Sequence, residues 1–362
     1  MEHYIPPFGI NDPELTTLDA QETYLGRLDY NLSLWKNALS FTSGYEIGSG
    51  QSPRVEFSYL PVNPGEGQYT WIDRNQDSVL QVDEMEIAVF QDQASYIRVA
   101  VTTPDYVRTN NLVFNQNLRL EPRLIWIRPT NGAQKLLRRF ATQNTWQINR
   151  RTFNGNDAVQ PWNPFDNDIP DSALVTLNTT LRNVLFINRA DPAWDASLAQ
   201  GDNRSRVLLT TGFESRRLLD YTLHGRLNLA KQWSAEADVV RGERSSDNEA
   251  FATRDYDIGY WSAGPKLTWL PLRSFRTVAQ LTFRDSKNAL GEKETAQQNS
   301  WNLEMTWNPQ SQANDRGFRA ATSLRARFTY ADIRYSGDQN SAVAFAMLEG
   351  LQDGRNYLWG FS

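Results

Sequence analysis

The sequence predicts an all-β protein, an antiparallel transmembrane β-barrel of about 14 strands with long loops on one side. Apolar and polar residues alternate in runs of about ten to thirteen residues, whereas an average globular strand has about five to six. Short turns and long polar connections follow each other along the chain. Aromatic residues reach 12% in a chain that is only 40% hydrophobic, which is typical of a barrel with aromatic girdles and a polar lumen.

The elements follow from the alternation. A first hairpin is predicted over 28–34 and 39–47. Further strands are predicted at 221–229, 233–239, 265–269, 275–283, 301–307 and 318–330, and less regular ones at 54–60, 96–102, 111–121, 142–152, 173–181 and 205–215. Short turns are expected near 35–38, 230–232 and 270–273, and long loops near 154–171, 243–255, 285–298 and 331–355, the last with a short helix over 341–351. The final run from Asn356 is too short to span a membrane, so a closing strand is expected beyond it.

Two residue sets define the expected faces of the barrel. A membrane girdle is expected from the tryptophans on the apolar side, which are Trp233, Trp261, Trp269, Trp301 and Trp307. The spacing from Trp261 to Trp269 corresponds to roughly 20 Å along a barrel axis, close to the height of an apolar band of about 25 Å. A charged lumen is expected from the alternate positions Glu236, Arg276, Glu304, Arg325 and Arg327.

Composition excludes several classes of function. The net charge is −5, so no basic face for nucleic acid is expected. With no cysteine and two histidines, the chain has no disulfide, thiolate nucleophile or histidine-rich metal site. No apolar run reaches the length of a membrane helix, and Met1–Tyr4 lacks the start of a signal peptide, so an exported protein would have further residues upstream. No catalytic motif occurs, and we expect no enzyme activity; carboxylates such as Glu236 and Glu304 are the only basis for a hydrolase alternative.

One motif predicts a metal-binding site. Residues 73–84 fit the calcium-loop pattern D-x-[DN]-x-[DN]-G-x5-E, with Ser78 in place of the turn glycine. The expected ligands, in loop order, are Asp73, Asn75, Asp77, the Val79 carbonyl and Glu84. An extended segment is expected before the loop and a helix over 83–90 after it. We expect a structural Ca²⁺ that pins a long insertion; an Asp- and Asn-rich surface turn is the alternative.

A resemblance adds a location. The block Gly65–Asp73, followed by Asp83–Ala94 and by Phe90–Val99 (FQDQASYIRV), resembles the C-terminal region of large, mostly uncharacterised outer-membrane proteins of Bacteroidota. The ending Gly350–Trp359 resembles their penultimate loop and hairpin start. The resemblance covers about 15–362. It implies a place in the cell outer membrane and implies no activity.

These observations divide the chain into an N-terminal extended segment over 1–22 and a barrel region over 23–362, with the insertion at about 61–95. The expected function is that of a barrel segment in a larger protein, acting in transport, secretion or surface organisation at the cell surface. Its partners would be outer-membrane lipid and other outer-membrane or periplasmic subunits. The alternative is a soluble all-β, calcium-stabilised carbohydrate-binding module that uses exposed tryptophans.

Overall fold

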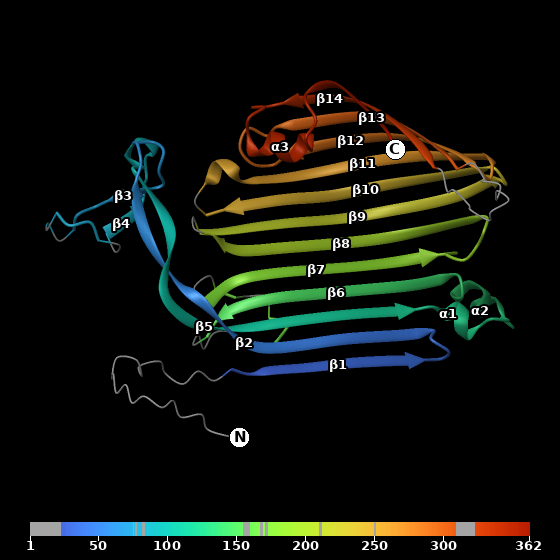
Figure 1. The fold of residues 1–362 in the computed structure, drawn as a ribbon, viewed down its shortest axis with the longest axis horizontal. Helices are drawn as coiled ribbons and strands as arrows, with labels where there is room; N and C mark the ends of the chain where they lie inside the picture. Colours follow the sequence, from blue (N-terminus) through green and yellow to red (C-terminus); the bar gives the residue numbers. More distant parts are fainter. Residues whose placement is uncertain are drawn as a thin grey trace, which may run out of the picture.

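A computed structural model describes residues 23–362 except 75, 77, 82–83, 155–159, 167–168, 171–172, 210–211, 250 and 309–322. The described chain is all-β and forms one large antiparallel sheet (Figure 1). Thirteen strands follow each other along this sheet in chain order, and β3 and β4 lie off the path, so the described strands number 15. Within the described residues, no helix has the length and apolar character to cross a membrane.

Each strand of the main sheet hydrogen-bonds to the next, which is the pattern of a meander. The bounds are β1 Leu25–Leu34, β2 Leu39–Pro61, β5 Tyr96–Leu120, β6 Phe140–Phe153, β7 Leu174–Ile187, β8 Trp194–Leu209, β9 Gly212–Ala230, β10 Trp233–Asn248, β11 Tyr256–Leu272, β12 Phe275–Asn288, β13 Thr295–Trp307, β14 Leu324–Ser336 and β15 Gly354–Phe361. Most of these strands have 13 to 19 residues, well beyond a globular average of about five to six.

β2 and β5 continue past the edge of the sheet as a two-stranded ribbon, beyond a register shift between Pro53 and Val55. Two short strands, β3 Tyr69–Trp71 and β4 Met85–Ile87, pair at its tip (Figure 1). We call this extension, residues 54–102, the arm. Arg98 lies 4.4 Å from the ring centre of Phe57 and forms an ion pair with Glu249, so the arm contacts the loop between β10 and β11.

Three short helical segments lie in connections: α1 Pro122–Ile125, α2 Gly132–Leu137 and α3 Ala342–Leu348, with single 3-10 turns at Gln91–Gln93 and Ala252–Arg254. The helix expected over 341–351 therefore corresponds to α3. Ser341 caps it by accepting a hydrogen bond from the Ala344 amide at 3.0 Å.

Several sequence-based expectations for the connections are wrong. The strands extend into the segments 243–255, 285–298 and 331–355, where polar residues continue the alternation, so the remaining loops there are 249–255, 289–294 and 337–353. The strand expected at 205–215 spans the turn between β8 and β9, and Gly212 at φ 112° marks that turn. The helix expected at 83–90 is β4, because Met85–Ile87 pair with β3. The start of the strand expected at 318–330 lies outside the described residues.

Two clusters of buried hydrophobic side chains lie where a connection folds over the sheet. Ile258, Ala296 and Ile333 pack under α3, and Leu112, Phe114 and Ile148 pack under the segment 160–166. Arg150, only 1% exposed, holds that segment by donating to the carbonyls of Asp166, Gln160, Pro161 and Asn163. No second layer of described residues covers the rest of the sheet.

Candidate functional site

The register separates the sheet into two faces, because directly paired residues share a face and successive residues along a strand point to opposite faces. One face, here called the apolar face, carries all five predicted girdle tryptophans. Trp233 pairs with Trp269, and their rings stack with centres 5.6 Å apart. Their exposed fractions are 38% for Trp233, 47% for Trp261, 36% for Trp269, 60% for Trp301 and 48% for Trp307.

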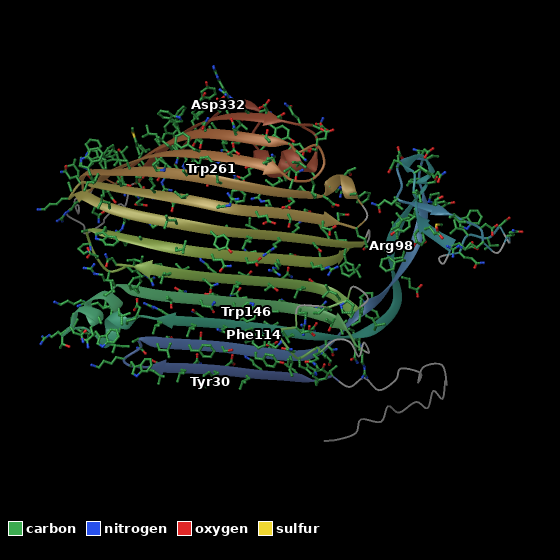
Figure 2. The ribbon with its side chains drawn as sticks, turned by 180° about the vertical axis from the view of Figure 1, so that it is seen from behind. Tyr30, Arg98, Phe114, Trp146, Trp261 and Asp332 are labelled. Atoms are coloured by element: carbon green, nitrogen blue, oxygen red, sulfur yellow. The ribbon has the colours of Figure 1, made fainter. Side chains whose placement is uncertain are left out.

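The same face exposes large aliphatic and aromatic side chains on most strands. Tyr30 near one edge of the sheet and Trp261 farther across it are two of them (Figure 2). On neighbouring strands such side chains form continuous rows, such as Leu267, Ala279 and Leu303. Other exposed members are Leu28, Leu198, Leu223, Leu227, Leu229, Val239, Phe283, Met305, Leu324, Phe328, Trp359 and Phe361. Along β12 this apolar stretch extends from Phe275 to Phe283, which at a strand tilt near 40° is roughly 20 Å in height. Water is a poor solvent for so large an uncovered apolar surface.

A single register row ends the apolar band toward the loops. From β6 to β14 it contains polar or amphipathic residues, which are Asn144, Asn183, Gln200, Tyr221, Arg241, Trp261, Asp285, Gln297 and Arg334. We call it the boundary row. Beyond it the same face becomes charged: Asp202 binds Arg204 at 2.7 Å and Arg217 at 3.0 Å. Where apolar residues recur beyond the row, as at Phe114 and Ile148, the segment 160–166 covers them.

The opposite face, here called the charged face, carries all five residues predicted to line a lumen. Glu304 contacts Arg327 at 2.9 Å and Arg325 at 3.6 Å on the next strand. Glu236 pairs with Lys266 at 2.5 Å. Arg276 lies opposite Thr306 on this face. The His224 ring lies 2.7 Å from Asp238, so it belongs to the same ladder of cross-strand polar pairs.

At the loop end, α3 lies over the charged face. Its residues Val343 and Met347 pack on Ile258 and Ala296. Glu349, just after the helix, accepts from Arg284 at 2.9 Å and from Arg244 at 3.3 Å, and Arg244 also donates to the Ala346 carbonyl. Sequence analysis missed this anchor, because Arg284 and Arg244 lie 65 and 105 residues before Glu349 in the chain.

A polar hollow of about 820 Å³ lies beside α3, lined in part by Arg216, Arg254, Asp338 and the exposed ring of Phe345. Asp255, in the loop at its edge, accepts a 2.7 Å hydrogen bond from the Asn248 amide. Burial raises the pKa of Asp255 despite this bond, and the nearby Asp247 charge raises it further. The hollow therefore offers both signs of charge and a ring to a polar ligand.

The calcium-loop motif lies at the tip of the arm between β3 and β4. The Asp73 carboxylate accepts from the Ser78 amide at 2.9 Å, and Ser78 is left-handed at φ 59°, the conformation that the missing glycine would favour. Glu84 is only 3% exposed and accepts from Trp71 Nε1 at 2.9 Å and from the Arg74 amide at 3.2 Å. Val79 is described, whereas Asn75 and Asp77 lie outside the described residues. The described residues include no group of three or more Asp, Glu, His or Cys arranged to hold a metal.

Neither the scan against protein-family models nor the search of curated proteins found a match to this chain.

Proposed function

We propose that this sheet is the wall of an outer-membrane β-barrel, with the apolar face against lipid and the charged face toward an enclosed interior. The observation that carries the proposal is the uncovered apolar band together with the boundary row that ends it. A soluble sheet with two solvated faces gains nothing from twenty or more exposed large apolar side chains. In lipid, the same side chains are in their preferred environment, and the strands have the length needed to cross it.

The charged face suits a water-filled interior. Its carboxylates and guanidinium groups are partly exposed, and each pair such as Glu304 and Arg327 needs water to satisfy its remaining donors and acceptors. We infer that the barrel acts in transport, secretion or surface organisation as part of a larger protein. The hollow beside α3 is the place where a polar cargo would first contact the interior.

The calcium loop supports the same proposal in a structural role. Asp73 and Glu84 lie at the two ends of a loop whose Ser78 backbone already has the left-handed turn, and their oxygens are the ligands that Ca²⁺ prefers. A bound ion would offset the mutual repulsion of the loop carboxylates and stiffen the arm. Calcium titration of the native protein, Asp73→Ala and Glu84→Ala tests this: only the native protein should bind, and equal binding by all three would remove the site.

The chain has no cysteine, so a fluorophore attached to a single introduced cysteine reports on one face without labelling elsewhere. Val239 and Val240 are neighbours on β10 that point to opposite faces, with Val239 47% exposed. A fluorophore on Val239→Cys should be quenched strongly by brominated lipid in vesicles, and one on Val240→Cys weakly. Equal quenching at the two positions would contradict the assignment of faces.

Two further observations separate the barrel from a soluble carbohydrate-binding module. A closed barrel should migrate faster on SDS gels before heating than after it. A module that uses the exposed tryptophans would be monodisperse in detergent-free buffer and would bind glycans in a calcium-dependent way. The second outcome would overturn the proposed function.

A further inference from the structure

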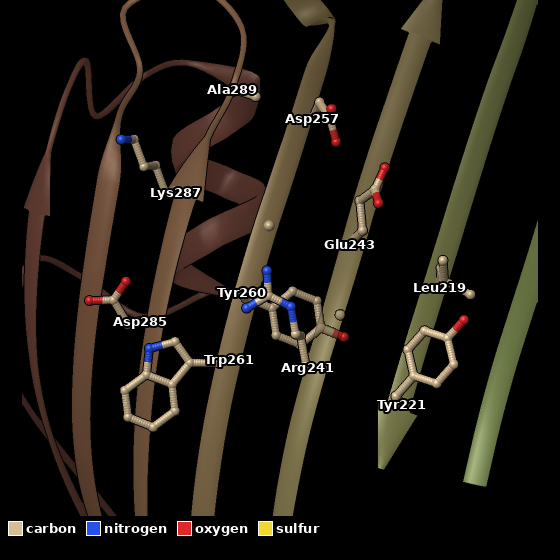
Figure 3. A pocket seen from close by; sticks show the side chains of 12 residues that line it. Leu219, Tyr221, Arg241, Glu243, Asp257, Tyr260, Trp261, Asp285, Lys287 and Ala289 are labelled. Atoms are coloured by element: carbon tan, nitrogen blue, oxygen red, sulfur yellow. The ribbon is translucent and has the colours of Figure 1, made fainter.

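A hollow of about 560 Å³ interrupts the apolar face where it meets the boundary row (Figure 3). β9 supplies Tyr221, β10 supplies Arg241 and Glu243, β11 supplies Asp257 and Trp261, and β12 supplies Asp285 and Lys287. Apolar side chains such as Leu223 and Phe283 continue directly below it. The hollow therefore joins a charged rim to an apolar floor that extends toward the short turns.

Gly259 creates the space. It lies on the apolar face between Glu243 and Lys287 in the register, and a Cβ atom placed on it would meet no atom within 4 Å. A larger residue here would project into the hollow without disturbing the strands, because the Gly259 backbone needs no left-handed conformation.

The charged side chains around this hollow do not form ion pairs with one another. Among the described residues, neither Arg241 nor Lys287 has a carboxylate within ion-pair distance, and neither Glu243 nor Asp257 has a cation within that distance. Only Asp285 is engaged, by accepting from Gln297 Nε2 at 3.1 Å. Two cations and two carboxylates without an ion pair thus border the same hollow, and the charge of Glu243 also acts on Arg217 on the neighbouring strand. The hollow lies at the depth where aromatic residues favour the interface of a bilayer.

We propose that this hollow binds the headgroup of a phosphoethanolamine lipid. The phosphate would lie against Arg241 and Lys287, the ammonium would donate to Glu243 and Asp257, and the acyl chains would extend over the apolar band. The pattern of charges is complementary to a zwitterion with both signs, whereas a purely anionic headgroup would meet the carboxylates. This inference rests on the proposed function, since it needs the apolar band to contact lipid.

The test is native mass spectrometry of the full-length protein in detergent with dioleoyl lipids that carry phosphoethanolamine, phosphocholine or phosphoglycerol. We expect the phosphoethanolamine lipid to be retained at least about fivefold more than either of the others, because it alone carries an ammonium group that can donate hydrogen bonds to carboxylates. Equal retention of the three lipids would overturn the proposal.

Variants separate the contributions of the groups that would bind the phosphate from those that would bind the ammonium. Arg241→Gln with Lys287→Gln should lower the retention of all three lipids. Glu243→Gln with Asp257→Asn should lower phosphoethanolamine retention and raise phosphoglycerol retention, which reverses the preference. Gly259→Leu should lower retention of every lipid while leaving the charges unchanged.

Arg334→Gln is the matched control, because Arg334 lies in the boundary row but outside the hollow. Variants that change retention no more than this control would refute the site. A protein that enters bilayers and shows no lipid preference would remove this inference alone, whereas one that stays in aqueous buffer would remove the proposed function as well.

Discussion

Ala279 on β12 provides a direct measure of the environment of the apolar face. It lies midway between Phe275 and Phe283, four residues from each, and pairs with Leu267 and Leu303 on the same face. At about 3.3 Å per residue and a tilt near 40°, it is roughly 10 Å from either edge of the apolar band, so it would lie near the bilayer midplane in the proposed barrel. Ala279→Arg should therefore lower the free energy of unfolding by about 2–4 kcal/mol, the cost of arginine at that depth in a membrane barrel.

The neighbouring residue is the control. Val278 points to the charged face and pairs with Glu304, so Val278→Arg adds the same side chain at the same depth beside a carboxylate. Its effect should stay within about 1 kcal/mol. The measurement is urea unfolding from lipid vesicles followed by the fluorescence of the 12 tryptophans. A loss of 2–4 kcal/mol is about a 30- to 900-fold change in the folded-to-unfolded ratio. Small and equal effects of the two variants would mean that water, not lipid, contacts both faces, and the reasoning would be refuted.

Three further predictions concern the connections. Ser78→Gly should tighten calcium binding about fivefold, as measured by calorimetry. A residue with a side chain in the left-handed conformation of Ser78 costs about 1 kcal/mol more than glycine does. Unchanged affinity would argue against a calcium loop. Asp255→Asn keeps the acceptor for the Asn248 amide and removes a carboxylate whose pKa the fold raises. The folded protein disfavours the ionised form of Asp255, so the variant should be the more stable protein at neutral pH. Its advantage should fade as the pH falls through the pKa of Asp255 in the folded state and then through its pKa in the unfolded state. A pH-independent difference between the two unfolding transitions would contradict this. Arg150→Met should release the segment 160–166, seen as faster proteolysis there with the strands still protected, since four carbonyls lose their shared donor.

Sequence alternation was sufficient to predict an all-β chain of long antiparallel strands and to place every girdle and lumen candidate on a consistent face. The reason is geometric: a period of two assigns faces without any knowledge of tertiary contacts, and the first hairpin, predicted at 28–34 and 39–47, pairs as expected. The transmembrane barrel itself stays a prediction, because alternation specifies faces and not the closure of the sheet or the solvent beyond it.

Loop boundaries were less accessible from sequence, because polarity does not distinguish a loop from a strand that continues beyond the apolar band. Ser245 and Asp285, predicted in loops, lie in β10 and β12. The turn between β8 and β9 was missed because Gly212 was the only strong signal there. β4 was read as a helix from residues 83–90, and pairing with Tyr69–Trp71 overrides that local preference.

The boundary row explains why the two ends of this sheet differ. Toward the short turns, the apolar face is mostly apolar to the end of β13 at Trp307, with Asn299 and Asp332 as polar exceptions directly beside the boundary row. Toward the loops it becomes charged from Arg241 onward while the strands continue. A strand that extends into water needs polar residues on both faces, and an apolar residue there needs protein cover, as at Ile148. The arm extends from this same end, so a calcium loop at its tip would lie on the side of the membrane that the long connections face. For an outer-membrane barrel that side is the cell surface, where calcium is abundant enough to fill a weak site.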